Sequence, residues 1–290
     1  MRATLHLVSA ADYRHFRTTF NATLEGAAES ITKNRTPIDA DRVLKVAHAF
    51  IAEKPRTFAE ISAMLTAEMP ESDVGAMRYT VRTHIPLVQV PITTGWSYPG
   101  TPAFTLADTW LGQPVSPDDH LPDLIRRYLA AFGPATIADM QTWSYIPLAT
   151  LKTAFETLRP ELKVYRDEKK KELFDLPDSP VPSADTPAPV RFLPEFDNLV
   201  LSHKVRTRIV ADEFRKKVYL PALRVAATIL IDGFVGAVWK VEKTKGIATL
   251  SIEPLVPLTK TLRSELESEA ESLVRFVEPD AKSYALTWVE

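Results

Sequence analysis

The sequence contains no cysteine. This absence excludes disulfide bonds, zinc sites with thiolate ligands and thiol nucleophiles. Long hydrophobic runs are absent too, because the longest, Val225–Ile231, is far too short to span a bilayer. The N-terminus lacks the apolar stretch of a secretory signal. We therefore expect a cytoplasmic protein without membrane attachment.

Glycine and histidine are scarce. The nine glycines provide little material for loops that hold phosphates, and no Walker, dinucleotide-binding, serine-hydrolase or zinc-protease motif is found. The histidines lack the short spacing of metal-ligating pairs. The six are His6, His15, His48, His84, His120 and His203. We expect neither a metal site nor a cofactor.

An excess of one charge is also missing. The 35 basic and 37 acidic residues leave a formal net charge of −2. This balance argues against polyanion binding over the whole surface. It leaves room for basic patches, whose influence reaches about 8–10 Å in physiological salt. The 290 residues, 45% of them hydrophobic, suit two or three domains.

Proline, in contrast, is abundant. Six of the 23 prolines lie between Pro177 and Pro194. Proline fixes φ and removes a backbone donor, so this stretch is expected to be extended rather than helical. We interpret it as a boundary between structural regions. The predicted domains are residues 1–115, 116–180 and 181–290.

An internal repeat lies before this boundary. Pro55–Ile61 resembles Pro134–Met140, at an offset of 79 residues. Each copy begins a helix with capping-box spacing, through Thr57 and Glu60 in the first copy. Thr136 and Asp139 are the equivalent pair in the second copy. An apolar-faced helix precedes each copy, and a further helix follows it.

Each repeat ends in two short strand-like segments joined by a turn. In the first, residues 87–90 and 103–106 flank a turn at 95–102. In the second, residues 162–166 and 172–176 flank a charged turn at 167–171. Three helices followed by a hairpin, twice over, are typical of tandem winged-helix units, which are helix-turn-helix folds with a β-hairpin wing. The alternative is a pair of helix–hairpin units that serve packing only.

The last third has a different pattern. Asp232-Gly233 and Lys245-Gly246 are turn dipeptides between strand-like runs, and residues 258–277 form an acidic amphipathic helix pattern. The fold class is therefore predicted as α+β, with tandem winged helices and a C-terminal antiparallel meander backed by a helix. The three predicted strands are Ala226–Asp232, Val235–Glu242 and Ile247–Glu253.

Basic residues concentrate on the elements that contact DNA in winged-helix proteins. Taken singly, each cluster is more often a solvated surface than a phosphate site. The candidates are Arg78 and Arg82 on the first predicted recognition helix, Lys152 and Thr153 on the second, Arg166, Lys169, Lys170 and Lys171 in the second hairpin, and Lys204, Arg206 and Arg208 in a basic stretch that continues to Lys217.

Two carboxylates stand close together after the proline-rich stretch. If Arg191–Asn198 is extended, Glu195 and Asp197 lie on one face with Arg191. Such a pair can transfer protons or position a water molecule. The alternative is structural: Asp197 and Asn198 cap a turn, and Glu195 pairs with Arg191.

Several longer strings resemble a bacterial winged-helix DNA-binding family, which includes the DNA glycosylases that unhook interstrand crosslinks and remove alkylated bases. The strings are Thr4–Val8, Arg127–Thr136, Glu172–Pro177, Thr186–Asn198 and Ile231–Phe234. The resemblance covers essentially the whole chain. It implies three winged-helix domains around a DNA-binding concavity. In active members it also implies hydrolysis of the N-glycosidic bond by a Gln-x-Gln or Gln-x-Asp motif upstream of the segment matching Thr4–Val8.

This chain departs from that pattern. None of its three glutamines, Gln89, Gln113 and Gln141, has Gln or Asp two residues later. The chain opens almost directly on Thr4–Val8, which is predicted to be a strand. We therefore expect the first domain to be N-terminally incomplete, either by true loss or because Met1 is an internal methionine.

Three functional hypotheses follow. The preferred one is a monomeric protein that binds double-stranded DNA, associates with the nucleoid when bound, and has no base-excision activity of its own. The second is an active glycosylase that uses Glu195 or Asp197. The third is a winged-helix adaptor for other proteins. Salt-dependent duplex binding and base release distinguish the three.

Overall fold

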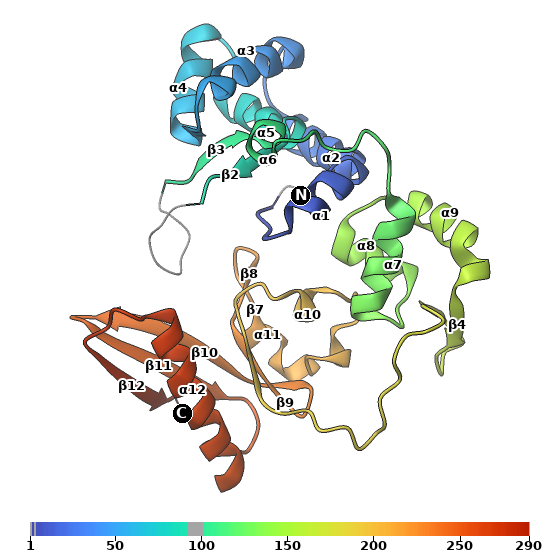
Figure 1. Cartoon of the computed structure of the whole chain (residues 1–290), viewed down its shortest axis with the longest axis vertical. Coiled ribbons are helices and arrows are strands. Elements are labelled where there is room, and N and C mark those ends of the chain that lie inside the picture. Colours follow the sequence, from blue (N-terminus) through green and yellow to red (C-terminus); the bar gives the residue numbers. More distant parts are fainter. Residues whose placement is uncertain (1, 3, 92–100, 290) are drawn as a thin grey trace. The chain divides into compact units, whose positions relative to one another are not determined.

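The computed structural model describes residue 2, residues 4–91 and residues 101–289. The chain divides into two units, and Figure 1 labels most of their helices and strands. The first unit comprises Met1–Ala131 and Ser144–Leu162, and the second comprises Phe132–Trp143 and Lys163–Glu290. These boundaries differ from the predicted ones at 115/116 and 180/181, and the three domains expected from the sequence stay a prediction. None of the helices in the described ranges has the length and apolar composition needed to cross a bilayer.

Helices dominate the first unit. The capping box is present at α4: Thr57 Oγ1 accepts the Glu60 backbone N–H at 3.2 Å, and the Glu60 carboxylate accepts the Thr57 N–H at 2.7 Å. The helices are α1 (Ala10–Phe16), α2 (Asn21–Thr32), α3 (Ala40–Glu53), α4 (Phe58–Glu68), α5 (Val74–His84), α6 (Ala107–Leu111), α7 (Leu121–Phe132) and α9 (Leu148–Leu158), with the 3-10 helices η1 (Thr18–Phe20) and η2 (Arg159–Glu161).

The predicted first hairpin is confirmed. β2 (Leu87–Gln89) pairs antiparallel with β3 (Ala103–Leu106), and Leu87 lies opposite Leu106. A strand that the sequence analysis missed, β1 (Arg56–Thr57), pairs with the other side of β3. Most of the predicted turn at 95–102 lies outside the described residues.

The core of this unit forms where α3, α4 and α5 meet, as the apolar spacing of these helices requires. α5 also packs against α2. The fully buried side chains of this cluster include Val43, Ala47, Ile51, Ile61, Leu65, Met77 and Val81.

The strand predicted at Thr4–Val8 is wrong. These residues have no regular secondary structure, and Leu7 is 98% exposed. The alternation of apolar residues indicated a strand, but a strand forms only where another segment supplies hydrogen-bond partners. Ser9 follows as the N-cap of α1, and its hydroxyl accepts the Asp12 N–H at 3.0 Å.

The second unit contains the C-terminal sheet. The predicted meander is confirmed, because β9 (Thr228–Ile231), β10 (Phe234–Thr244) and β11 (Ile247–Pro254) pair antiparallel in succession. The expected turns join them, with φ of 80° at Gly233 and 87° at Gly246. The sheet is wider than predicted. Its order is β12-β11-β10-β9-β6, where β6 comprises Arg191–Leu193, and β12 (Ser283–Trp288) runs parallel to β11.

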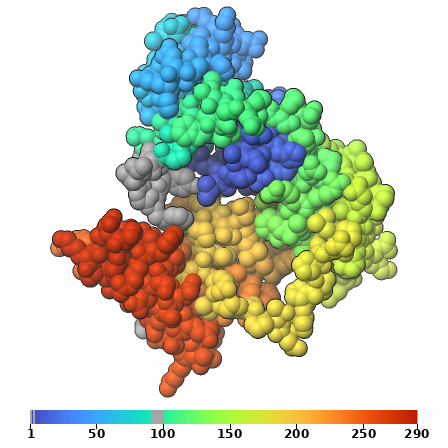
Figure 2. Space-filling model, in the orientation of Figure 1, coloured from blue at the N-terminus to red at the C-terminus, as the bar shows by residue number. Residues whose placement is uncertain are grey.

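A helix covers this sheet, as the amphipathic pattern predicted. Leu266, Ala270 and Val274 of α12 (Lys260–Val277) pack with Leu250 and Ile252 of β11. Figure 2 shows α12 and the neighbouring strands as one continuous mass, in red and orange. The remaining elements of the unit are α8 (Ile137–Ser144), α10 (Asn198–Leu201), α11 (Arg215–Val218), η3 (Arg206–Arg208), η4 (Asp212–Phe214), β4 (Lys163–Arg166), β5 (Glu172–Asp175), β6 (Arg191–Leu193), β7 (Tyr219–Leu220) and β8 (Arg224–Val225).

Candidate nucleic-acid interface

A groove beside α5 contains two of the predicted DNA-binding residues. Arg78 and Arg82 are exposed, because Met77 and Val81 occupy the buried face of α5. They are four residues apart and therefore stand about one helical turn from each other. The groove has a volume of about 580 Å³, and Arg35 also lines it. The aromatic side chains of the lining are Phe58, Tyr79 and Phe104. Three cations beside apolar rings form a surface suited to an anionic, partly apolar ligand.

Both ends of α5 are fixed by charged side chains. At its N-terminus, Asp73 accepts the Ala76 N–H at 2.7 Å and pairs with Arg35 at 2.9 Å. These two contacts hold the pKa of Asp73 below its ordinary value. At the C-terminus, the buried Arg17 donates to the carbonyl oxygen of Thr83 at 2.8 Å. A cation there offsets the negative end of the helix dipole.

The second predicted recognition helix, α9, also belongs to the first unit. Lys152 and Thr153 are exposed on it, while Leu151 and Phe155 are buried. The Thr153 hydroxyl donates to the carbonyl oxygen of Ala149 at 3.3 Å. Lys152 is therefore the more available of the two for an external ligand.

The hairpin β4–β5 presents the second basic cluster, in the second unit. Lys163 pairs with Asp175 and Arg166 with Glu172 in the antiparallel register. Asp167 shapes the turn, because its Oδ1 accepts the backbone N–H groups of Lys169 at 2.9 Å and Lys171 at 2.7 Å. The side chains of Lys169, Lys170 and Lys171 are exposed.

The third basic cluster is anchored to the second repeat by Asp139. This carboxylate caps α8 as predicted, accepting the Thr136 N–H at 2.8 Å, and it also accepts the backbone N–H of Lys204 at 2.8 Å. Burial raises the pKa of Asp139, but the hydrogen bonds from Thr136 and Lys204 outweigh it, so the net shift is downward. The carboxylate therefore stays ionised and holds the start of the basic segment.

His203 and Arg208 complete this network. The Arg208 guanidinium donates to the carbonyl oxygen of Pro134 at 2.7 Å and lies 3.0 Å from His203 Nε2. Burial and the nearby positive charge of Arg208 lower the pKa of His203. Arg208 is therefore partly committed to structure, whereas the side chain of Lys204 is exposed.

A small hairpin, β7–β8, extends this basic region. Arg206 and Arg215 lie over the ring of Tyr219, 5.4 Å and 5.9 Å from its centroid. At the tip, Ala222 and Leu223 have φ of 58° and 59°, and Leu223 is 93% exposed. The sequence analysis missed this hairpin, since its two-residue strands leave no periodicity to detect.

The two carboxylates of the Arg191–Asn198 string differ in their surroundings. Asp197 is the N-cap of α10 and accepts the Leu199 N–H at 2.8 Å, as the structural alternative predicted. Glu195 is exposed, and Arg191 donates to the carbonyl oxygen of Val190 instead. Asn198 accepts the indole N–H of Trp143 at 3.3 Å.

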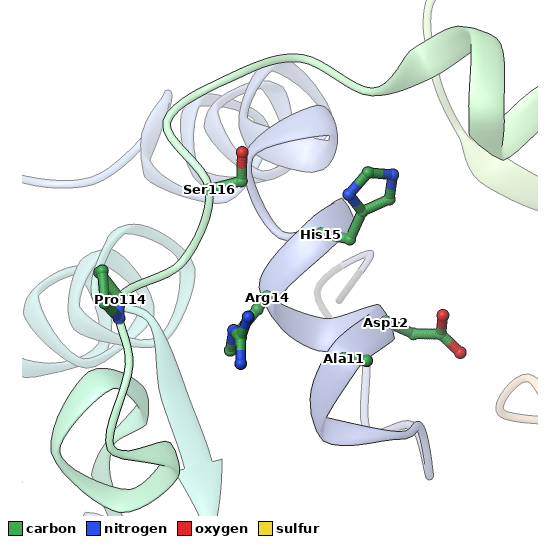
Figure 3. A pocket seen from close by; sticks show the side chains of 6 residues that line it. All are labelled: Ala11, Asp12, Arg14, His15, Pro114 and Ser116. Atoms are coloured by element: carbon green, nitrogen blue, oxygen red, sulfur yellow. The ribbon is translucent and has the colours of Figure 1, made fainter.

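A feature outside the predicted set lies at α1. A cavity of about 370 Å³ is lined by side chains of α1 and of the segment that leads to α7. Figure 3 shows Arg14 extending from α1 toward the loop segment that carries Pro114 and Ser116. His15 at its edge also contacts Asp123 of α7 at 3.0 Å. Sequence spacing could not reveal this, because the two residues are 108 positions apart.

Comparison with known proteins decides the family. The family described as DNA glycosylase AlkZ-like matches residues 1–276. The chain belongs to this AlkZ-like family. An interstrand DNA cross-link repair glycosylase from Streptomyces sahachiroi is 28% identical over 153 residues, which are 51% of this chain and 41% of that protein. The solved structure of DNA glycosylase AlkZ from the same organism covers 94% of this chain and 78% of its own length, with a TM-score of 0.69 and 21% identity.

The AlkZ-like fold is thus shared over nearly the whole chain, as a mixture of helices and sheets. The sequence match is narrower, because it spans less than half of the curated relative. Membership of the family agrees with the resemblance found in the sequence. Family membership alone assigns no role to the individual basic residues or to Glu195.

Proposed function

We propose that this AlkZ-like chain binds double-stranded DNA through tandem winged-helix units. The observation that carries the proposal is the α5 groove, where Arg78 and Arg82 stand exposed beside Arg35 and three aromatic rings. Exposed guanidinium groups at one-turn spacing on a helix suit phosphate or base-edge contacts. The family membership makes nucleic acid the natural ligand.

The order of elements supports the proposed winged-helix arrangement. In the first unit, α4 and α5 would be the helix-turn-helix, with α5 as the recognition helix and β2–β3 as the wing. The second repeat would use α8, α9 and the hairpin β4–β5 in the same way. The C-terminal sheet with α12 would form the remaining domain.

Phosphate contacts would come from the hairpin and from the basic segment of the second unit. Lys169, Lys170 and Lys171 extend from a turn that Asp167 shapes through backbone bonds. Lys204 is held in place through its backbone, which leaves its ammonium group available. Contacts of this kind position a protein on DNA without reading the sequence.

For catalysis, we propose that the chain has no base-excision activity of its own. Hydrolysis of a glycosidic bond needs a positioned water molecule and a charge stabiliser beside an extruded nucleotide. Asp197 is used as a helix cap. The second candidate, an active glycosylase that uses Glu195, is favoured by the family match. An adaptor for other proteins is the third and would need no basic groove. We further propose a monomer that acts in the cytoplasm at the nucleoid, without a small-molecule cofactor.

The α5 groove can be tested directly. We would measure duplex affinity by fluorescence anisotropy over a range of salt for the chain and for Arg78→Ala with Arg82→Ala. Each neutralised phosphate contributes about 0.9 to the slope of log K against log salt. The double variant is expected to flatten this slope by about 1 to 2 units.

A matched control removes two positive charges elsewhere in the same unit. Lys45 and Lys54 are exposed on α3 and at its end. Replacing both with alanine should leave the slope unchanged. Equal effects of the two double variants would mean that only net charge matters, and duplex binding that ignores salt would contradict the proposal.

A further inference from the structure

Two histidines and one aspartate meet between α1 and α7. One ligand atom from each of His15, His120 and Asp123 lies within 4.8 Å of the others. Asp123 Oδ2 is 3.0 Å from His15 Nε2 and 3.9 Å from His120 Nδ1. Around a tetrahedral zinc ion with bonds of about 2.0–2.2 Å, ligand atoms stand roughly 3.3–3.5 Å apart. The spacing is therefore close to that of a metal site.

Neighbouring groups orient two of the three ligands. His120 Nε2 lies 2.8 Å from Ser116 Oγ, which also accepts the Asp118 N–H at 3.3 Å. When Nε2 donates its proton to this hydroxyl, Nδ1 carries the lone pair on the side of Asp123. Arg126 donates to the other carboxylate oxygen, Oδ1, at 3.0 Å. Oδ2 is thereby left for the histidines, and such supporting contacts are usual around metal ligands.

The two imidazole rings stack, with centroids 3.7 Å apart and planes inclined by 23°. The lone pair of an imidazole nitrogen lies in the plane of its ring, so two nearly parallel rings cannot both point at one ion while they stay stacked. Binding of a shared ion therefore requires the His120 ring to turn out of this stack, which must also shorten the 3.9 Å separation between its Nδ1 and Asp123 Oδ2.

We propose that His15, His120 and Asp123 bind one zinc-like divalent ion that links α1 to α7. Imidazole nitrogen and carboxylate oxygen suit zinc, whereas magnesium and calcium prefer oxygen alone. The ligands are partly exposed, His15 by 38% and Asp123 by 49%, so an ion can reach them.

The test uses chain without a histidine tag, stripped of metal with a chelator. Equilibrium dialysis against Zn²⁺ should give one bound ion per chain, and Co²⁺ should give the visible absorption of a tetrahedral site. His15→Ala and His120→Ala should each abolish both signals. His48→Ala is the matched control, because His48 is an exposed helical histidine in the same unit and should change neither.

A supporting residue gives a second measurement. Ser116→Ala should keep one ion per chain but weaken Zn²⁺ affinity about 10- to 100-fold, since it removes the group that orients His120. Circular dichroism would verify that each variant is folded. Absence of bound Zn²⁺ in the parent chain overturns the proposal, and so does unchanged binding in both histidine variants. Duplex affinity is measured separately, so failure of the metal site leaves the DNA-binding proposal standing.

Discussion

At the scale of single residues, Asp139 shows how one side chain serves two purposes. The sequence predicted its role as a helix cap from local spacing. Its second role, holding the backbone of Lys204, joins residues 65 positions apart. Because one buried carboxylate satisfies three donors, including the Thr136 hydroxyl at 2.7 Å, its loss would leave several of them unpaired.

His203 leads to a prediction about pH. Burial and the positive charges of Arg208 and Arg206 lower its folded-state pKa, whereas the negative charge of Asp139 raises it. The unfolded histidine titrates near 6.5. Below that pH the unfolded chain takes up a proton that the folded chain refuses, so the free energy of unfolding falls as pH falls. His203→Gln should reduce this dependence between about pH 6.5 and 5, measured by urea denaturation.

The exposed His48 is again the control, and His48→Gln should keep the parent's pH dependence. Asp139 does not confuse the result, because its lowered pKa places its own titration below this window. If His203→Gln left the dependence of the unfolding free energy on pH unchanged, the folded protein would already accommodate the protonated ring.

Local signals explain which candidate residues could be found from the sequence. Arg78 and Arg82 stood out because helical spacing separates an exposed face from a buried one, and the structure exposes both. Glu195 and Asp197 were found as a pair, yet only the structure shows that Asp197 caps α10. His15 was passed over because its partners come from a distant segment.

At the scale of elements, the hairpin β4–β5 could be predicted because its pairing is local. The turn and the strand register involve residues only a few positions apart. We predict that Lys169→Ala with Lys170→Ala flattens the salt slope of duplex binding by about 1 to 2 units and weakens all duplex sequences similarly. The measurement is anisotropy with two unrelated duplexes.

The control for this hairpin removes two exposed lysines elsewhere in the second unit. Lys240→Ala with Lys260→Ala carries the same charge change on β10 and α12. A sequence-dependent loss of affinity in the hairpin variant would point to base contacts instead of phosphate contacts. If the parent and the hairpin variant had equal salt slopes of duplex binding, Lys169 and Lys170 would be solvent-exposed side chains that do not contact phosphates.

Two strands of the C-terminal sheet that the sequence did not reveal share a physical cause. β6 and β12 are the two edges of the C-terminal sheet. Edge strands have one paired side and partly exposed faces, so their apolar pattern is weak. β12 pairs parallel with β11, and the α12 helix lies between the two in the chain. The false strand at Thr4–Val8 is the converse case, since its pattern is clear but no described segment forms a sheet with it.

At the scale of the whole molecule, the two units are interleaved along the chain. Phe132–Trp143 belongs to the second unit although the segments on both sides belong to the first. Composition and proline content identify linkers. They carry no signal for a short segment that packs in one unit while its neighbours in the sequence pack in the other. The predicted boundary at 180/181 came from the prolines alone.

The proposed lack of base excision is a property of the whole chain. We predict that purified chain incubated with alkylated or crosslinked duplex releases no base above the buffer background, because its three glutamines form neither the Gln-x-Gln nor the Gln-x-Asp motif that the resemblance implies for active members, and Asp197 is used as the N-cap of α10. Liquid chromatography of the released bases is the measurement. Release that disappears in Glu195→Gln but persists in Asp197→Asn would instead establish the glycosylase alternative.

The tip of β7–β8 has a consequence for stability. Ala222 and Leu223 both adopt the left-handed conformation, which costs non-glycine residues about 1–2 kcal/mol each. Glycine adopts this conformation without that cost, and the three-residue loop 221–223 between the paired Leu220 and Arg224 contains none. The backbone of this hairpin thus tolerates a more stable sequence than the one it has. An engineer seeking a thermostable variant would begin at this turn and would have to give up the exposed leucine to obtain it.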